Sequence, residues 1–255
     1  MEQYVAEFVG TLILIVLGDG VVANVVLAKT KGNDSGWLVI ATAWGLAVAI
    51  AVYCVGRISG AHINPAVTFG LASIGQFDWA MVPGFVAAQM AGAFTGAVIV
   101  YLAYFSHWSV TEDPAAKLAV FSTSPEIRST PANFICEFIG TAMLLFGVLS
   151  IGANAGAITE AGDIDLSAVY ATGIAPLLVG LLVFAIGLSL GGPTGYAINP
   201  ARDLGPRIAH AILPIPGKGG SDWGYSWIPV AAPILGGIAG AMAYKALGLM
   251  EPWAL

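Results

Sequence analysis

The sequence predicts an all-α membrane protein with six transmembrane helices plus two re-entrant half-helices, arranged as an inverted three-span repeat. Three observations support this fold class: an apolar composition, six apolar stretches of membrane length, and two Asn-Pro pairs that each open a shorter apolar segment. The 255 residues are 58% hydrophobic and 9% charged, with a mean hydropathy of +0.85. Because soluble domains carry about 25% charged residues, this composition is that of an integral membrane protein.

The six long stretches are the expected spans, because a membrane-spanning helix needs about 20 apolar residues. They cover residues 4–27, 37–56, 80–104, 132–154, 170–190 and 228–248. Six spans place both termini on one side of the membrane. The basic residues of the loops on the other side are Lys29, Lys31, Lys117, Arg128 and Lys218. Only Lys245 marks the C-terminus, and loop 155–169 carries only the acidic residues Glu160, Asp163 and Asp165. By the positive-inside rule, this small count favours termini outside the cell.

Two further apolar segments, residues 64–74 and 199–212, have only about half the length of a span. Each begins at an Asn-Pro pair, and proline is favoured in the first turn of a helix, so each is predicted to be a half-helix. Their lead-ins, "SGAHI" (59–63) and "TGYAI" (194–198), contain glycine and precede the helix start. Non-helical backbone at membrane depth survives only inside protein or beside water, so the lead-ins predict an internal aqueous path.

An internal repeat relates the two halves of the chain. Residues 6–18, "AEFVGTLILIVLG", match residues 136–148, and residues 59–70 match residues 194–205 in the same order. We interpret residues 1–255 as a single transmembrane channel domain with repeats of about 1–115 and 130–255. Three spans per repeat invert the second copy, so the two half-helices are expected to meet at their N-termini. Helix N-termini carry partial positive charge, which predicts an electropositive waist.

Seven charged residues fall at membrane depth, where each costs about 2.5–3.5 kcal/mol on insertion scales. They are Glu7, Asp19, Arg57, Glu137, Arg202, Asp203 and Arg207. Glu7 and Glu137 occupy equivalent repeat positions, so we interpret them as buried acceptors for the N–H groups of the lead-ins. The alternative is a pair of helix-end carboxylates near the headgroups. Asp19 and Arg57 lie nearer to span ends and are interpreted as interfacial anchors.

Further polar and small residues add to this interpretation. Asp203 and Arg207 are spaced for an i,i+4 ion pair, which is expected to shape the mouth beside Arg202. His62 is expected to line the pore or to fix its loop. Glycines and alanines spaced by four predict close helix packing. They are Gly84, Ala88, Gly92 and Gly96 in one span, and Gly236 and Gly240 in the last.

The composition also excludes several classes of protein. A net charge of −6 without a basic run argues against nucleic acid as a partner. No nucleophile–base pair and no cluster of metal ligands stands out, so neither an enzyme nor a cofactor nor a metal is expected. The N-terminus "MEQYVAEF" lacks the basic start of a signal peptide. Cys54 and Cys136 lie in apolar stretches and are interpreted as buried free thiols.

The paired motifs "SGAHINPAV" and "TGYAINPARD", in a six-span inverted repeat, resemble the aquaporin superfamily over residues 4–248. The aspartate directly after the second Asn-Pro-Ala-Arg is similar to the glycerol-facilitator branch, the aquaglyceroporins. The resemblance implies the aquaporin fold, a homotetramer with one pore per subunit, and cytoplasmic termini in a bacterial plasma membrane. We prefer that orientation to the one from the charge count. It also implies an Asn-Pro-Ala constriction of Asn64, Pro65, Ala66, Asn199, Pro200 and Ala201.

The selectivity filter is carried over from the same resemblance, by position relative to the two motifs. It comprises Trp44, Gly187, Tyr196 and Arg202. Water-selective members resemble one another in having histidine at the position of Gly187, so glycine here implies a wider ring. Most glycerol facilitators have phenylalanine at the position of Tyr196, and this departure leaves the solute range open.

A mechanism follows from the chemistry of these side chains. Trp44 and Tyr196 would form an apolar corner for the carbon edge of a polyol, and Arg202 would donate to its hydroxyl oxygens. The carbonyls expected to accept its hydroxyl protons belong to Gly60, Ala61, His62, Ile63, Gly195, Ala197 and Ile198. Asn64 and Asn199 would donate to one passing oxygen, which breaks a chain of proton-conducting waters.

The function expected is passive conduction of glycerol and other small neutral solutes, with some water, while ions and protons are excluded. The alternatives are a facilitator whose main solute is water, lactic acid, urea or dihydroxyacetone, and an ion-coupled secondary transporter. A coupled carrier usually needs a titratable group at the midplane, where this chain is expected to have Asn64 and Asn199. The expected partners are the solutes, the lipid bilayer and further copies of the chain.

Overall fold

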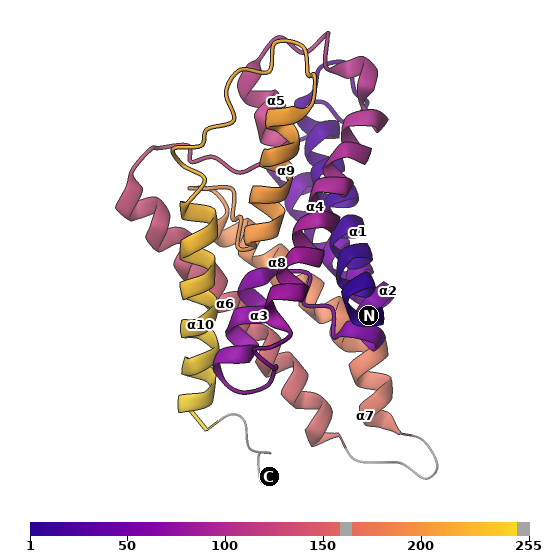
Figure 1. The fold of residues 1–255 in the computed structure, drawn as a ribbon, viewed down its shortest axis with the longest axis vertical. Helices are drawn as coiled ribbons and strands as arrows, with labels where there is room; N and C mark the ends of the chain where they lie inside the picture. The colour runs from indigo at the N-terminus through magenta and orange to yellow at the C-terminus, as the bar shows by residue number, and fades with distance from the viewer. Residues whose placement is uncertain (159–164, 249–255) are drawn as a thin grey trace.

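The computed structural model describes residues 1–158 and 165–248, and every regular element within them is a helix (Figure 1). Six helical segments of the described chain are long and apolar enough to cross a membrane. They are α1 (Glu2–Val26), α2 (Trp37–Ser59), α4 (Val82–Ala103), α6 (Thr130–Ala157), the segment Leu166–Leu190 and α10 (Ile228–Ala246). The predicted all-α fold with six spans is confirmed.

The fifth span is composite. It begins with α7 (Leu166–Val169), continues through a π-helical turn, η2 (Tyr170–Ile174), and ends with α8 (Ala175–Leu190). It therefore starts four residues before the predicted range of 170–190. Of the acidic residues predicted for the preceding loop, Glu160 and Asp163 lie outside the described residues, and Asp165 caps α7 by accepting from the N–H of Ala168.

The two half-helices are α3 (Pro65–Ser73) and α9 (Pro200–Ile212), and each begins at the predicted residue. Asparagine is the N-cap of both: Asn64 Oδ1 accepts from Ala66 N–H at 2.8 Å, and Asn199 Oδ1 from Ala201 N–H at 3.0 Å. An N-cap acceptor followed by proline satisfies the first turn and fixes its backbone. Figure 1 shows α9 in the upper part of the bundle and α3 in the lower part.

Loop 105–131 contains structure that the sequence did not indicate. A 3₁₀ turn, η1 (Phe105–His107), is followed by α5 (Pro114–Phe121), which Asp113 caps through the N–H of Ala115. Helix α5 packs against both α1 and α9. It therefore covers one end of α1 and brings the chain at Phe121–Thr123 close to the second half-helix.

Close helix contacts follow the predicted glycine spacing. A Cβ atom on Gly92 of α4 would lie 2.3 Å from the carbonyl oxygen of Phe8 in α1, and one on Gly236 of α10 would lie 2.3 Å from that of Phe138 in α6. Glycine at these places lets the backbones of neighbouring helices touch. The pairs α1–α4 and α6–α10 run side by side in Figure 1.

Apolar side chains face outward from this bundle, and its interior contains polar groups as well as an apolar core. Leu102, Met143 and Leu181 are half exposed on the outside, whereas Glu7 and Gln89 are fully buried. This distribution suits a surface that faces lipid and an interior that handles polar groups. Cysteine burial differs from the expectation: both thiols are free, but Cys54 is exposed and Cys136 is only partly buried.

Candidate functional site

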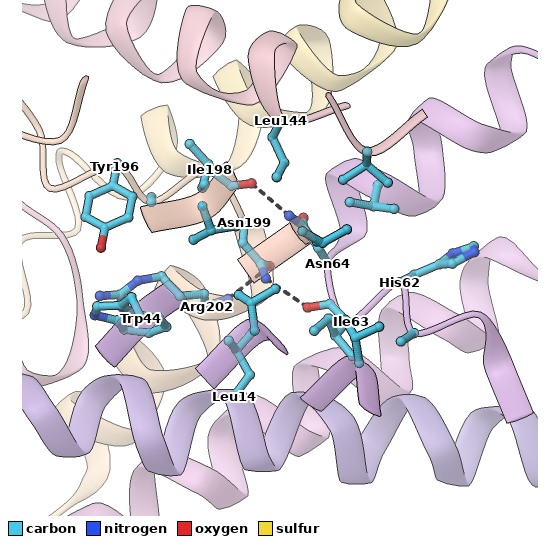
Figure 2. A pocket seen from close by; sticks show the side chains of 18 of the residues that line it. Leu14, Trp44, His62, Ile63, Asn64, Leu144, Tyr196, Ile198, Asn199 and Arg202 are labelled. Carbon is cyan, nitrogen blue, oxygen red and sulfur yellow. Dashed lines mark hydrogen bonds between the residues drawn. The ribbon is translucent and has the colours of Figure 1, made fainter. Parts of the chain in front are cut away.

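A cavity runs between the helices and is lined by both lead-ins, from Gly60 to Asn64 and from Gly195 to Asn199. The cavity is also lined by apolar side chains, which are those of Leu14, Val48, Val52, Val67, Leu144, Val148, Val179 and Val183. Trp44, Tyr196 and Arg202 gather at one end, His62 lies at the other, and the two asparagines lie between them (Figure 2). The cavity is thus lined both by the polar backbone of the lead-ins and by apolar side chains.

The lead-ins share an unusual backbone. Gly60 and Gly195 have φ values of 83° and 82°, and the β-branched Ile63 and Ile198 have φ values of 43° and 42°. Such a residue in the left-handed region costs about 1–3 kcal/mol unless its surroundings fix it. The same strain in both lead-ins turns successive peptide groups away from helical bonding and toward the cavity.

Two buried carboxylates hold the lead-ins in this conformation. Glu7 accepts from the N–H groups of His62 at 2.9 Å and Ile63 at 2.7 Å. Glu137 accepts from those of Ala197 and Ile198, both at 2.9 Å. Glu7 and Glu137 are 0% and 1% exposed, so these charge-assisted bonds form away from water and offset the backbone strain. The structure therefore contains the bonds that the repeat predicted.

The side chains around these carboxylates differ between the halves. Glu7 also accepts from the hydroxyl of Ser59 at 2.6 Å and from Nε2 of Gln89 at 2.7 Å, whereas Glu137 accepts from the hydroxyl of Thr194 at 2.7 Å. Gln89 lies on α4 and was not singled out in the sequence. The sequence did contain a signal for it, because a single amide side chain in an apolar span needs a hydrogen-bond partner inside the protein.

The two N-caps are joined to each other's lead-in. Nδ2 of Asn64 donates to the carbonyl of Ile198, and Nδ2 of Asn199 donates to that of Ile63, each at 2.8 Å (Figure 2). One N–H of each amide is used in this way, and one remains for another acceptor. Two of the seven carbonyls expected to line the cavity are thus already bonded. The motif residues Pro65, Ala66, Pro200 and Ala201 are buried in the first turns and do not line the cavity.

Arg202 and Trp44 lie together at one end of the cavity. The guanidinium carbon lies 4.2 Å from the centroid of the Trp44 ring, a cation–π contact. Nη1 donates to the carbonyl of Phe121 at 3.3 Å. Tyr196 lies opposite, and Figure 2 shows its hydroxyl pointing toward this pair. Its Oη is buried without a partner among the residues that the structure describes.

Gly187 does not line the cavity; it lies behind Tyr196. A Cβ atom at position 187 would lie 2.7 Å from Cζ of Tyr196. Trp37 also supports this wall, because its Nε1 donates to the carbonyl of Gly187 at 2.9 Å and its ring contacts Tyr196 edge-on. Trp37 was missed in the sequence, where a tryptophan at the start of a span is typical of a membrane-interface residue.

The interpretation of Asp19 as an interfacial anchor is wrong. Asp19 is fully buried, and its Oδ1 lies 3.4 Å from Nη1 of Arg202. It is buried because α5 folds against α1, which the sequence did not predict. Arg57, by contrast, is exposed in the last turn of α2.

Asp203 and Arg207 form the predicted pair at 2.8 Å, and neither is exposed. Asp203 also accepts from both the N–H and the hydroxyl of Thr123. Arg207 donates to the carbonyls of Thr123 and Ser221, each at 2.8 Å. The pair therefore connects the loops at Thr123 and Ser221 to α9 by hydrogen bonds, next to Arg202.

His62 both lines the cavity and is fixed in place. Its Nδ1 lies 3.1 Å from the hydroxyl oxygen of Thr68, and its ring packs against Phe77 and Phe85. Within residues 1–158 and 165–248, no three His, Cys, Asp or Glu side chains come together as metal ligands.

Comparison with known proteins agrees with this architecture. The family model described as Major intrinsic protein matches residues 1–244. The chain is 64% identical over 245 residues to the probable glycerol uptake facilitator protein of Thermotoga maritima, covering 96% of this chain and 99% of that one. It is 55% identical to the glycerol uptake facilitator protein of Bacillus subtilis, covering 96% and 85% of the two chains. The solved aquaglyceroporin of Plasmodium falciparum superposes with a TM-score of 0.79 at 32% identity, over 96% of this chain and 95% of the other. The chain therefore belongs to the major intrinsic protein family.

Proposed function

We propose that this protein is a passive channel that conducts glycerol and other small neutral solutes, with some water, across the plasma membrane. The observation that carries the proposal is the mixed lining of the cavity, in which the strained backbone of the two lead-ins occurs together with apolar side chains. A linear polyol matches such a lining, because it has hydroxyls along one edge and carbons along the other. Relatives named glycerol uptake facilitators, at up to 64% identity, support the same solute.

The end of the cavity at Trp44, Tyr196 and Arg202 is proposed as the selectivity filter. The rings of Trp44 and Tyr196 would contact the carbon edge, while the guanidinium of Arg202 would donate to hydroxyl oxygens. The free hydroxyl of Tyr196 adds one further donor and acceptor at this place. Gly187 contributes by leaving room for the Tyr196 ring.

The waist is proposed as the barrier to protons. The remaining N–H groups of Asn64 and Asn199 would donate to one solute or water oxygen, which then cannot accept a proton from a neighbouring water. The N-termini of α3 and α9 begin at these residues, and their partial positive charge opposes cations. The carbonyls of Gly60, Ala61, His62, Gly195 and Ala197 would accept hydroxyl protons on either side of the waist. Those of Ile63 and Ile198 already accept from the two asparagines.

We also propose the larger arrangement. The chain is one channel domain whose halves, about 1–115 and 130–255, are inverted copies, supported by the matching lead-ins, carboxylates and N-caps. Four copies would assemble as a homotetramer with a pore in each subunit and cytoplasmic termini. Half-exposed apolar side chains on the outer faces of the spans suit contact with lipid and with neighbouring subunits.

The decisive experiment is swelling of proteoliposomes, followed by stopped-flow light scattering with glycerol and a panel of urea, dihydroxyacetone and lactic acid. A passive channel gives rapid glycerol uptake that is the same with and without ion gradients. Saturable uptake that depends on an ion gradient would instead support a secondary transporter.

A further inference from the structure

Asp19 lies directly behind the candidate filter. Its Oδ1 is 3.4 Å from Nη1 of Arg202, and its side chain has no exposed surface. The same Nη1 donates to the carbonyl of Phe121, and the Trp44 ring covers the guanidinium. Arg202 is therefore held by one anionic, one polar and one aromatic group.

The charges of this region occur in two pairs. Asp203 is bound by Arg207, which donates to both of its carboxylate oxygens, at 2.8 Å from Nε and 3.0 Å from Nη2. Asp203 is thus matched to Arg207, which leaves Asp19 to balance Arg202. With both carboxylates ionised, the two pairs together carry no net charge.

The pairing of Asp19 with Arg202 is mutual. The second oxygen, Oδ2 of Asp19, is buried without a hydrogen-bond partner among the described residues. A buried carboxylate is strongly unfavourable unless it is paired, so the guanidinium of Arg202 provides the positively charged partner that Asp19 needs. Arg202 in turn has Asp19 as the carboxylate within ion-pair distance.

We propose that Asp19 is a positioning residue of the filter that balances the charge of Arg202 and thereby keeps small anions out of the pore. An unbalanced guanidinium at a narrow, low-dielectric constriction would attract anions. Its N–H groups donate to neutral hydroxyls whether or not the charge is balanced. This inference rests on the proposed channel function.

The test compares nitrate and glycerol entry into liposomes that contain the wild-type protein or the Asp19→Asn variant. Nitrate enters from a potassium nitrate gradient with valinomycin present, so that potassium balances the charge. Glycerol entry reports that the variant is folded and open. We expect Asp19→Asn to raise nitrate entry relative to glycerol entry by about tenfold or more.

Asp34→Asn is the matched control. Asp34 is exposed, and its φ of 60° is one that asparagine tolerates, so this variant removes the same charge from the surface. Its ratio of nitrate to glycerol entry should equal that of the wild type. Asp19→Ala removes the buried charge without adding an amide and repeats the test if Asp19→Asn fails to fold.

The double variant Asp19→Asn/Arg202→Gln separates charge from packing. It has neither charge, so it should exclude nitrate as the wild type does. An unchanged nitrate ratio in the folded Asp19 variant overturns the proposal, and so does a double variant that admits as much nitrate as the single one. Glycerol entry with the wild type tests the channel function separately, because the nitrate comparison is made between variants.

Discussion

The phenol ring of Tyr196 occupies the space that a side chain at position 187 would need. A Cβ atom on Gly187 would lie 2.7 Å from Cζ and 2.9 Å from Oη of Tyr196. Trp37 ties the two together, since it donates to the carbonyl of Gly187 and packs on the Tyr196 ring with centroids 5.6 Å apart. A larger residue at position 187 must therefore displace the Tyr196 ring, so in the proposed filter the two positions would set the width jointly.

Gly187→His should lower glycerol permeability by about tenfold or more, and water permeability by less. The imidazole would push the Tyr196 ring into the cavity, and a narrower opening affects the larger solute more. Stopped-flow light scattering with each solute measures both rates. Gly192→His is the control, because a Cβ at exposed Gly192 meets nothing within 4 Å. Equal losses for glycerol and water would contradict the filter assignment.

Tyr196→Phe tests the hydroxyl separately from the ring. Oη has no partner among the described residues, so its removal breaks no hydrogen bond within them, and the unfolding temperature should stay the same or rise. Glycerol permeability should fall about threefold if the hydroxyl bonds to the passing solute. A lower unfolding temperature would mean that the hydroxyl has a structural role, and an unchanged glycerol rate would remove it from the filter.

Arg202→Ala should increase the proton leak of liposomes relative to their glycerol uptake, because it removes the positive charge of the proposed filter and leaves the charge of Asp19 unbalanced. It should also destabilise the protein by about 3–5 kcal/mol, since Asp19 would remain buried without its partner. A pH-sensitive dye inside the vesicles and thermal unfolding in detergent measure the two effects. Arg57→Ala, at an exposed position, should change neither.

The sequence was sufficient where a local signal and the repeat agreed. Both half-helices begin at the expected asparagines because an Asn-Pro pair is itself an N-cap followed by a first-turn proline. Glu7 and Glu137 could be assigned as acceptors because the two repeats place a carboxylate at the same position, although each accepts bonds from residues more than 50 positions away.

Asp19 could not be assigned in this way, because its partner is 183 residues distant and the helix that buries it gave no signal. The eight residues of α5 are too few to display a helical pattern, so the sequence does not indicate this helix. Because α5 packs against α1, Asp19 lies inside the protein and not at the membrane interface. Trp37 was missed for a related reason, since its bond to Gly187 spans 150 residues.

Glu137→Gln should destabilise the protein by about 1–3 kcal/mol and reduce glycerol uptake. A carboxylate can accept from Ala197, Ile198 and Thr194 together, whereas an amide has one oxygen and directs its NH₂ at a donor. The left-handed Ile198 would then lose part of its support. Thermal unfolding and liposome swelling report the effects, and Glu2→Gln, at an exposed position, is the control. Full stability of Glu137→Gln would show that the carboxylate does not hold the lead-in.

Arg207→Lys should destabilise the protein by about 3 kcal/mol or more although it keeps the charge. The planar guanidinium binds Asp203 through two nitrogens while it also donates to the carbonyls of Thr123 and Ser221, and a single ammonium cannot reach all of these positions. Both loops at the mouth should loosen together, so amide hydrogen exchange of residues 121–123 and 221–222 should rise along with the loss of stability.

Arg128→Lys supplies the comparison, because the Arg128–Asp222 pair at 2.6 Å has an arginine side chain that is 59% exposed. Exposed pairs contribute about 0–1 kcal/mol, so this variant should unfold within a few degrees of the wild type. If Arg207→Lys were no worse than Arg128→Lys, the buried pair would not be what fastens the mouth. A large loss of stability for Arg207→Lys alone would show that the planar guanidinium is needed, since both variants keep the positive charge.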